Sequence, residues 1–346
     1  MKILKEEEYK DEELALGFFD TYFKGMKYAI FDIETTGLSP KNCQVILSGF
    51  VIPTGNGNFQ MIQYFAETLS DEAEVLIATM KILENVDFII TFNGQSFDIP
   101  FVEKRVNALN INSFKKPSQV YNLDIYRLVR KFSDVKKFVP NLKQKTLENF
   151  LGLYTTRDDQ IDGGKSVDQY FEYLATKDPE LERTILLHNS DDVKQLYRLC
   201  NILKKVDFHQ AMANVGFPCN ATTIENISLI RGMFRLTGRT LLADYTIYDD
   251  NTNLKLTIVH GILILNLQLN EKDGLTFLDL QGLFQACLDN GFAVHEDFQG
   301  TLDYFKNCNG LYLDRFLMLV VDGETNYKAA NLLGKYLIER IELNDN

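Results

Sequence analysis

The chain contains 346 residues, of which 45% are hydrophobic and 24% charged, and this length is enough for about two globular domains. No apolar run approaches the ~18 residues that span a bilayer, the start of the chain lacks the apolar core of a signal peptide, and five scattered cysteines without a CxxC pair favour neither disulfides nor zinc. The net charge of −12 argues against a protein that coats nucleic acid through bulk electrostatics, and we expect a globular protein of the cytoplasm without a membrane-spanning segment.

Residues 1–25 are charged and mixed in character, and they predict a helical arm with its helix at residues 11–23. Strands and helices then follow in a definite order. The predicted strands are residues 27–33, 44–52, 60–66 and 86–92, and the predicted helices are residues 72–83, 100–107, 123–131, 146–151, 166–176 and 181–203. Three strands in succession, followed by alternating strands and helices, predict an α/β domain with a mixed sheet covered by helices.

Two carboxylates lie at the end of the first strong strand, in the stretch Ile-Phe-Asp-Ile-Glu-Thr-Thr-Gly-Leu of residues 30–38. Residues i and i+2 of a strand point to the same side, so Asp32 and Glu34 face one spot. Two charges that are buried together are costly, through desolvation and mutual repulsion, unless a cation lies between them. The pair therefore predicts a site for a divalent cation.

A further acid follows the last predicted strand, in the stretch Phe-Asn-Gly-Gln-Ser-Phe-Asp of residues 92–98. Asn93 and Gly94 allow a tight reversal at the end of the strand, and Asp98 falls at the start of the next helix. A carboxylate at a helix N-terminus is stabilised by the helix dipole. Asp98 thus has two interpretations, as a helix cap and as a member of the acidic site.

The third group of polar residues lies inside the helix predicted at residues 181–203. His188 and Asp192 are one turn apart on one face, so an imidazole and a carboxylate can approach the same site. A histidine alone would favour a structural role, whereas Asp192 beside it favours a functional pair. Asp191 is adjacent, but the helical spacing favours Asp192.

Positive charge is concentrated in one segment. Residues 104–145 contain eleven Lys or Arg and two acids, so this segment carries +9 and the remainder of the chain carries −21. Aromatic residues are interspersed among the basic ones, at Phe114, Tyr121, Tyr126, Phe132 and Phe138. Two interpretations stay open: a surface that holds a phosphate backbone, and a solvated face with ordinary core aromatics beneath it.

The three motifs, in this order, resemble the DEDD (DnaQ-like) 3′→5′ exonuclease superfamily and, within it, the YprB-type branch. The resemblance spans residues 27–205 and includes the stretches 122–130, 142–152 and 157–163. It implies a ribonuclease H-like fold for residues 26–206, with a mixed five-stranded sheet flanked by helices.

By this resemblance, Asp32, Glu34, Asp98 and Asp192 are metal-binding carboxylates, and with His188 they form the catalytic set. Oxygen ligands suit hard cations, so the implied cofactors are two divalent cations, Mg²⁺ or Mn²⁺. The resemblance implies that Asp32 bridges both ions and that Asp98 serves mainly the second. It implies that Glu34 and Asp192 hold the water-activating ion, and that His188 orients and deprotonates the nucleophile.

One feature departs from the family pattern, in which members carry either HxxxxD or YxxxD. Here His188 occurs at the YxxxD spacing, so membership of either subgroup stays open. The chemistry is retained, because a histidine with a pKa near ~6.5 is a better general base at neutral pH than a phenol with a pKa near ~10.

The same resemblance implies substrate contacts around the acids. Thr35, Gly37 and Leu38 would contact the terminal nucleotide, Asn93 would support the water shell of the second metal, and Asp124 would line the cleft. Structural interpretations stay open for these positions: an ordinary turn after the strand for residues 35–38, and a hydrogen-bonding role within the fold for Asp124.

Beyond residue 206 the resemblance ends, and residues 207–346 predict a smaller α+β accessory domain without a catalytic constellation. A capping box at residues 222–225 predicts a helix that ends at Gly238. The remaining predicted elements are strands at 254–259, 262–269, 275–280 and 316–321 and a helix at 326–343. Three tasks stay open for this domain: substrate gripping, binding of a partner protein and self-association.

These inferences predict a two-metal-ion phosphodiester hydrolase, a 3′→5′ exonuclease on single-stranded DNA or RNA with a free 3′ end. The polarity rests on the resemblance alone. Two alternatives stay open: a catalytically idle nucleic-acid-binding or assembly protein on the same fold, and an endonuclease. The presence of all four acids argues against the idle protein, because an unused cluster of carboxylates destabilises a fold.

Overall fold

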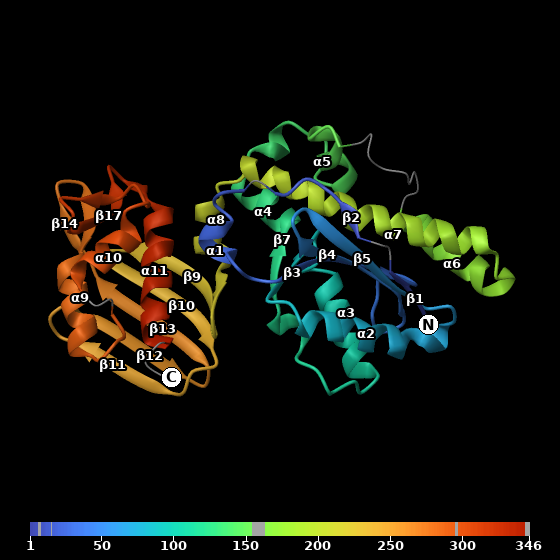
Figure 1. The fold of residues 1–346 in the computed structure, drawn as a ribbon, viewed down its shortest axis with the longest axis horizontal. Coiled ribbons are helices and arrows are strands. Elements are labelled where there is room, and N and C mark those ends of the chain that lie inside the picture. The colour runs from blue at the N-terminus through green and yellow to red at the C-terminus, as the bar shows by residue number, and fades with distance from the viewer. Residues whose placement is uncertain (6–7, 15, 154–162, 295–296, 343–346) are drawn as a thin grey trace. The chain divides into compact units, whose positions relative to one another are not determined.

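The computed structural model describes the chain apart from residues 6–7, 15, 154–162, 295–296 and 343–346. Most of the resembling stretch at residues 157–163 therefore lies outside the described residues. The chain divides into two compact units, Met1–Val206 and Asp207–Asn346 (Figure 1). Within the described part of the chain, no helix is both long enough and apolar enough to cross a membrane.

A seven-stranded mixed sheet forms the centre of the first unit, in the order β1-β5-β4-β3-β6-β7, with β2 also paired to β5. The strands are β1 Lys2–Lys5, β2 Tyr9–Lys10, β3 Tyr28–Thr35, β4 Val45–Gly55, β5 Asn58–Phe65, β6 Phe88–Thr91 and β7 Tyr121–Asp124. β3, β4 and β5 are antiparallel neighbours, whereas β3, β6 and β7 run parallel. The predicted mixed sheet is confirmed, with two strands more than the five expected.

Helices cover both faces of this sheet (Figure 1). They are α1 Asp20–Phe23, α2 Glu72–Glu84, α3 Asp98–Ala108, α4 Ile125–Phe132, α5 Gln144–Phe150, α6 Gly163–Thr176 and α7 Pro179–Leu199. Ser48 Oγ on β4 lies 2.6 Å from Thr79 Oγ1 on α2, whereas the next residue, Gly49, faces Asn189 on α7. Because alternate residues of a strand point to opposite faces, α2 and α7 lie on opposite sides of the sheet.

The parallel strands bring the acidic motifs together at the carboxyl ends of neighbouring strands. β3 pairs with β6 and β6 with β7, where Thr91 lies opposite Asp124. Residues that follow the carboxyl ends of such strands lie together, at the place where ligands bind in open α/β sheets. The β3–β4 register shifts between Glu34 and Thr35, which places a β-bulge beside the second acid of β3.

The first residues differ from the helical arm expected for residues 1–25. β1 and β2 pair with β5, and only Asp20–Phe23 is helical. The helix expected at residues 11–23 is therefore wrong for most of its length. Backbone pairing along the edge of β5 satisfies N–H and C=O groups that local helical periodicity, a weak prior, does not take into account.

The second unit contains two antiparallel sheets, ordered β11-β12-β13-β10-β9-β8 and β14-β15-β17-β16, with β18 paired to β17. Its strands are β8 Phe217–Cys219, β9 Thr222–Ile230, β10 Met233–Thr240, β11 Tyr245–Asp249, β12 Leu254–Val259, β13 Ile262–Gln268, β14 Asn270–Lys272, β15 Leu275–Asp279, β16 Leu311–Tyr312, β17 Phe316–Val321 and β18 Glu324–Thr325. Its helices are α8 Phe208–Val215, α9 Leu280–Asp289, α10 Phe298–Phe305 and α11 Tyr327–Glu342. The predicted α+β character of this region is confirmed.

The helix expected from Thr222 to Gly238 is wrong, because β9 and β10 form a hairpin there. Arg231 and Gly232 at its turn have φ values of 52° and 68°, the left-handed conformation of a two-residue hairpin turn. Burial alternates along β10, with Phe234 inside and Arg235 exposed, so one face of the hairpin lies on the core. This pairing outweighs the local capping signal.

A buried ion pair joins α2, α3 and the start of β4 in the first unit. Arg105 Nε and Nη2 donate to the two carboxylate oxygens of Glu72 at 2.8 and 2.6 Å, and the Val45 N–H donates to Glu72 Oε1 at 2.9 Å. Arg105 Nη1 also donates to Pro40 O at 3.2 Å, which ties the segment after β3 to α3. Glu72 is 2% exposed, so its charge depends on these donors.

We expect Arg105→Met to lower the free energy of unfolding by about 3–5 kcal/mol, because the Glu72 carboxylate would stay buried without its cation. The double variant Arg105→Met/Glu72→Gln should lose less, because the amide is neutral and its oxygen still accepts the Val45 N–H. Urea unfolding followed by circular dichroism measures both. Equal losses in the single and the double variant would contradict this account.

Candidate functional site

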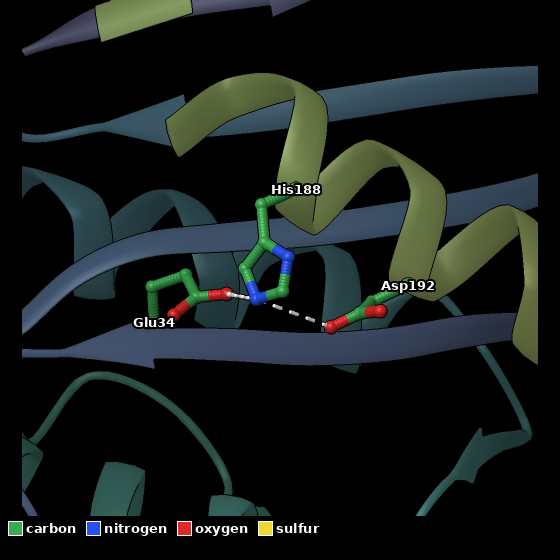
Figure 2. A group of neighbouring side chains, drawn as sticks. All are labelled: Glu34, His188 and Asp192. Atoms are coloured by element: carbon green, nitrogen blue, oxygen red, sulfur yellow. Dashed lines mark ion pairs between the residues drawn. The ribbon is translucent and has the colours of Figure 1, made fainter. Parts of the chain in front are cut away.

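The acids of β3 meet the polar face of α7. His188 Nε2 lies 3.7 Å from Glu34 Oε1 and 3.6 Å from Asp192 Oδ2, and Figure 2 shows the imidazole between the two carboxylates. One ligand atom from each of these residues lies within 4.8 Å of the others, and among the described residues no other group of three or more His, Cys, Asp or Glu does so. The structure therefore brings together three of the residues that the sequence singled out.

Asp32 is held in place by an amide from α7. Asn189 Nδ2 donates to Asp32 Oδ2 at 3.1 Å, and Asn189 Oδ1 accepts from Gln63 Nε2 of β5 at 3.0 Å. Gln63 Nε2 also donates to Leu186 O at 2.8 Å. These bonds link β5, α7 and β3, and they leave the amide nitrogen of the fully buried Asn189 facing Asp32.

The close approach of α7 to the sheet depends on Gly49, which lies opposite Asp32 in the β3–β4 pair. A Cβ at this position would lie 2.0 Å from Asn189 Oδ1 and 2.8 Å from its Cγ. Such contacts are far shorter than a van der Waals distance, so no larger residue fits while Asn189 keeps its place. Gly49 therefore helps to position the site, although it has no side chain that could bind or react.

Asp98 is the first residue of α3 and is 3% exposed. Its Oδ1 accepts the Ile33 N–H at 3.2 Å, so the carboxylate lies against the backbone of β3 between the two acids of that strand. Phe97, and not Asp98, is the N-cap residue of the helix. The geometry thus favours the interpretation of Asp98 as a member of the acidic site.

Burial raises the pKa of three of these carboxyl groups. Burial, followed by repulsion from neighbouring carboxylates, raises the pKa of Asp32 well above its usual range, and the Asn189 hydrogen bond opposes the rise. Burial raises the pKa of Glu34 to about 7, with His188 opposing it, and raises the pKa of Asp98 to about 7. No Lys or Arg whose side chain the structure describes forms an ion pair with Asp32, Glu34 or Asp98.

This donor set fits hard divalent cations. Asp32, Glu34, Asp98 and Asp192 offer carboxylate oxygens, which Mg²⁺ and Mn²⁺ prefer, and no thiolate accompanies them. The four carboxylates repel one another, and divalent cations would balance the negative charge that causes this repulsion. These four residues could therefore hold the ions.

The residues expected to contact the terminal nucleotide lie at the end of β3 and in the bend that follows it. Thr35 is 8% exposed, and its Oγ1 donates to Gly37 O at 2.8 Å, inside the bend. Gly37 has a φ of 153°, and a Cβ there would lie 2.8 Å from Cys43 Sγ. Leu38 is 85% exposed and is thus the residue of this bend that is available to a ligand.

Asp124 acts within the fold. The N–H groups of Asn93 and Gln95 donate to its two carboxylate oxygens at 3.0 and 3.1 Å, and the Arg127 N–H donates to it at 3.2 Å. Asp124 is therefore the last residue of β7 and the N-cap of α4, and it holds the segment that leads to Asp98. The helix α4 begins two residues later than expected. These contacts favour the structural interpretation that the sequence left open, and Asn93 contributes a backbone with a φ of 66° to this turn.

Three supporting residues were missed in the sequence. Ser166 Oγ on α6 donates to Glu34 Oε2 at 3.2 Å, and Asn189 and Gly49 fix the position of Asp32. Asn189 follows His188 directly, and its place in the polar stretch of residues 188–192 was the one signal available in the sequence. Gly49 lies in an apolar strand, and nothing local distinguishes it.

We expect Gly49→Ala to cost about 1–3 kcal/mol of stability, because the added methyl group overlaps the Asn189 amide. In the Asn189→Ala background the same substitution should cost much less, because the overlapping atoms are gone. Urea unfolding of the four proteins of this double-mutant cycle gives the coupling energy directly. Additive effects would show that the two residues do not constrain each other.

The part of the chain that carries these residues is similar to known proteins. A family model described as the RNase_H superfamily matches residues 29–204, just over half of the 346 residues. A DNA polymerase III PolC-type protein of Ureaplasma parvum is 30% identical over 151 residues, which cover 37% of this chain and 10% of that protein. The chain thus spans about a tenth of the length of that relative.

Among solved structures, the family B DNA polymerase of the archaeon Pyrobaculum calidifontis matches with a TM-score of 0.42 and 19% identity, over 52% of this chain and 24% of that one. The family match covers β4 to β7, nearly all of β3 and the helices that carry the acids and His188, whereas β1 and β2 lie before it. The chain therefore belongs to the RNase H superfamily.

Proposed function

We propose that the protein is a two-metal-ion phosphodiester hydrolase that acts as a 3′→5′ exonuclease on single-stranded DNA or RNA. The observation that carries the proposal is the meeting of Glu34, His188 and Asp192, whose ligand atoms lie within 4.8 Å of one another, beside an Asp32 whose pKa is raised by burial and by repulsion from Asp192 and Glu34. Membership of the RNase H superfamily and the similarity to a stretch of a DNA polymerase support nucleic acid as the substrate. The polarity follows from the resemblance of the motifs to DEDD exonucleases.

Asp32, Glu34, Asp98 and Asp192 would hold two Mg²⁺ or Mn²⁺ ions, which when bound lower the pKa of water and stabilise negative charge on phosphate oxygens. The chain itself prepares the ligands. The Asn189 amide holds Asp32 and the Ser166 hydroxyl holds Glu34, so both carboxylates have restricted orientations. Such outer hydrogen bonds orient ligands before an ion arrives, which lowers the cost of binding it.

His188 is placed to move a proton. Its Nε2 faces the carboxylates of Glu34 and Asp192 at 3.7 and 3.6 Å. An imidazole that takes a proton from a nearby water becomes a cation, and two carboxylates at this distance stabilise that cation. We therefore assign His188 the role of general base.

Hydrolysis should require Mg²⁺ or Mn²⁺, and Asp32→Asn or Asp192→Asn should abolish it, because each variant loses a charged ligand. Matched DNA and RNA oligomers, labelled at the 3′ or the 5′ end, show activity, polarity and sugar preference on a denaturing gel. Asp168→Asn, at an exposed position of α6, makes the same change of charge and should keep full activity.

Undiminished cleavage in EDTA, or full activity of Asp32→Asn, would refute the metal-dependent mechanism. A closed single-stranded circle distinguishes the mode of cleavage, because an exonuclease leaves it intact. Cleavage of the circle at the rate of the linear oligomer would assign an endonuclease instead.

The raised pKa values predict that stability depends on pH. Glu34 and Asp98 have pKa values of about 7 in the fold, against ordinary values of about 4, so their contribution to stability falls as the pH rises from about 4 through about 7. Mn²⁺ should therefore raise the Tm more at about pH 7.5 than at about pH 5.5, where protons compete with the ion. Differential scanning calorimetry measures this difference, and Glu34→Gln should reduce it. An equal rise at both pH values would contradict the assignment.

A further inference from the structure

A basic and aromatic segment of the chain, residues 125–144, adjoins the acidic site and has no role in the chemistry described above. It is formed by α4, the turn Val135–Lys137 and the start of α5. We call it the α4–α5 surface, and its residues are Tyr126, Arg130, Lys131, Lys136, Phe138 and Lys143.

The α4–α5 surface adjoins the acidic site through α5. Gln144 Nε2 at the start of α5 donates to the main-chain oxygen of Asp192 at 2.9 Å. Lys143 immediately precedes Gln144, so the basic start of α5 lies next to the helix turn that carries the metal-binding acid. A strand bound at Lys143 would therefore be close to the site of cleavage.

The surface adjoins the same site a second time, through α4. The Phe92 ring, which precedes Asn93, lies 5.7 Å from the Tyr126 ring in an edge-on contact, and Arg130 Cζ lies 5.9 Å from the Tyr126 centroid. Phe92, Tyr126 and Arg130 thus form a row. It leads from the segment before Asp98 outward along α4.

Exposure and charge show that this face is available to a ligand. Phe138 is 73% exposed, and Arg130, Lys131, Lys136 and Lys143 are exposed as well. As far as the chain is described, none of these four cations forms an ion pair, whereas the neighbouring Lys137 pairs with Asp134 at 2.7 Å. These four cations lie within fourteen residues of one another, in a chain whose net charge is −12.

We propose that the α4–α5 surface binds the single-stranded nucleic acid that leads to the acidic site. Phosphates would contact the four cations, and unpaired bases would stack on Phe138 and Tyr126. The inference rests on the proposed function and gives it a path for the substrate. It also answers an electrostatic need, because a group of carboxylates repels phosphate and a polyanion needs cations close by to be held there.

A binding measurement tests the proposal without hydrolysis. It uses the Asp32→Asn protein in EDTA and a fluorescent single-stranded oligonucleotide of about 20 nucleotides, a length that covers one or more such sites. Lys136→Glu/Lys143→Glu should weaken binding at least about tenfold and should make the slope of log K against log salt shallower by about 1.4, from ~0.7 for each phosphate contact. Lys81→Glu/Lys272→Glu makes the same change of charge at two other exposed lysines and should change affinity less than about twofold.

A second set of variants tests stacking. Phe138→Ala and Phe138→Leu should each weaken binding about tenfold, whereas Phe138→Tyr, which keeps an aromatic face, should bind as the parent does. Phe171→Ala removes a ring that is 48% exposed on α6 and should have no effect. Unchanged affinity in both the lysine pair and Phe138→Ala would overturn the inference and leave an acidic protein as the occupant to test.

The inference and the proposed function fail separately. Loss of oligonucleotide binding in the α4–α5 variants, with no hydrolysis by the unaltered protein, would keep this inference and overturn the nuclease. Metal-dependent hydrolysis by the unaltered protein, with undiminished binding in the same variants, would keep the nuclease and overturn the inference.

Discussion

The contact between Gly49 and Asn189 is the constraint on which the arrangement of the site depends. Because Gly49 has no side chain, α7 approaches the sheet closely enough for the Asn189 amide to reach Asp32 at 3.1 Å. His188 precedes Asn189, and Asp192 follows it by three residues on the same helix. The position of the Asn189 amide therefore also determines how far the His188 imidazole and the Asp192 carboxylate extend toward Glu34. A small residue in β4 thereby controls distances between groups that come from two distant segments.

The site brings several carboxyl groups together in a buried place, and the hydrogen-bond donors that the fold provides for them are uncharged. The Ile33 N–H bonds Asp98, the Ser166 hydroxyl bonds Glu34 and the Asn189 amide bonds Asp32. None of these donors carries a charge, so they orient the carboxylates without neutralising them. A lysine in the same positions would stabilise the fold more and would compete with a cation for the ligands. The arrangement therefore favours binding of a cation over stability of the empty site.

The parts of the site that could be predicted from the sequence are the pairs of residues whose spacing matches the repeat of a strand or of a helix. The spacing of two residues along β3 pairs Asp32 with Glu34, and the spacing of four along α7 pairs His188 with Asp192. The contacts of Gly49 with Asn189 and of Ser166 with Glu34 join residues more than a hundred positions apart, and the side chains that make them leave no pattern in either segment. The long strands and helices of the first unit were predictable for the same reason as the paired acids.

The errors in the fold have the same origin. β1 and β2 contain four and two residues, too few to show a period, and their conformation is decided by pairing with β5. Thr222 and Glu225 at the start of β9 have the spacing of a capping box, which also starts helices, and the turn at Arg231 and Gly232 is what distinguishes the hairpin. In both places a partner strand determines what the local sequence leaves undecided.

The pairing of β1 and β2 also changes which backbone groups the sheet exposes at its edge. β1 pairs along Ile62 to Phe65 of β5 and β2 pairs at Asn58 and Phe59, so the polypeptide covers its own longest edge strand. On the opposite side the outermost strand, β7, has four residues and ends at a carboxylate. An uncovered β5 would present a row of unpaired backbone groups, which is the template on which amyloid-like stacking begins. Pairing with β1 and β2 replaces this eight-residue edge with strands of four and two residues, and such short edge strands are poorer templates for pairing with another chain.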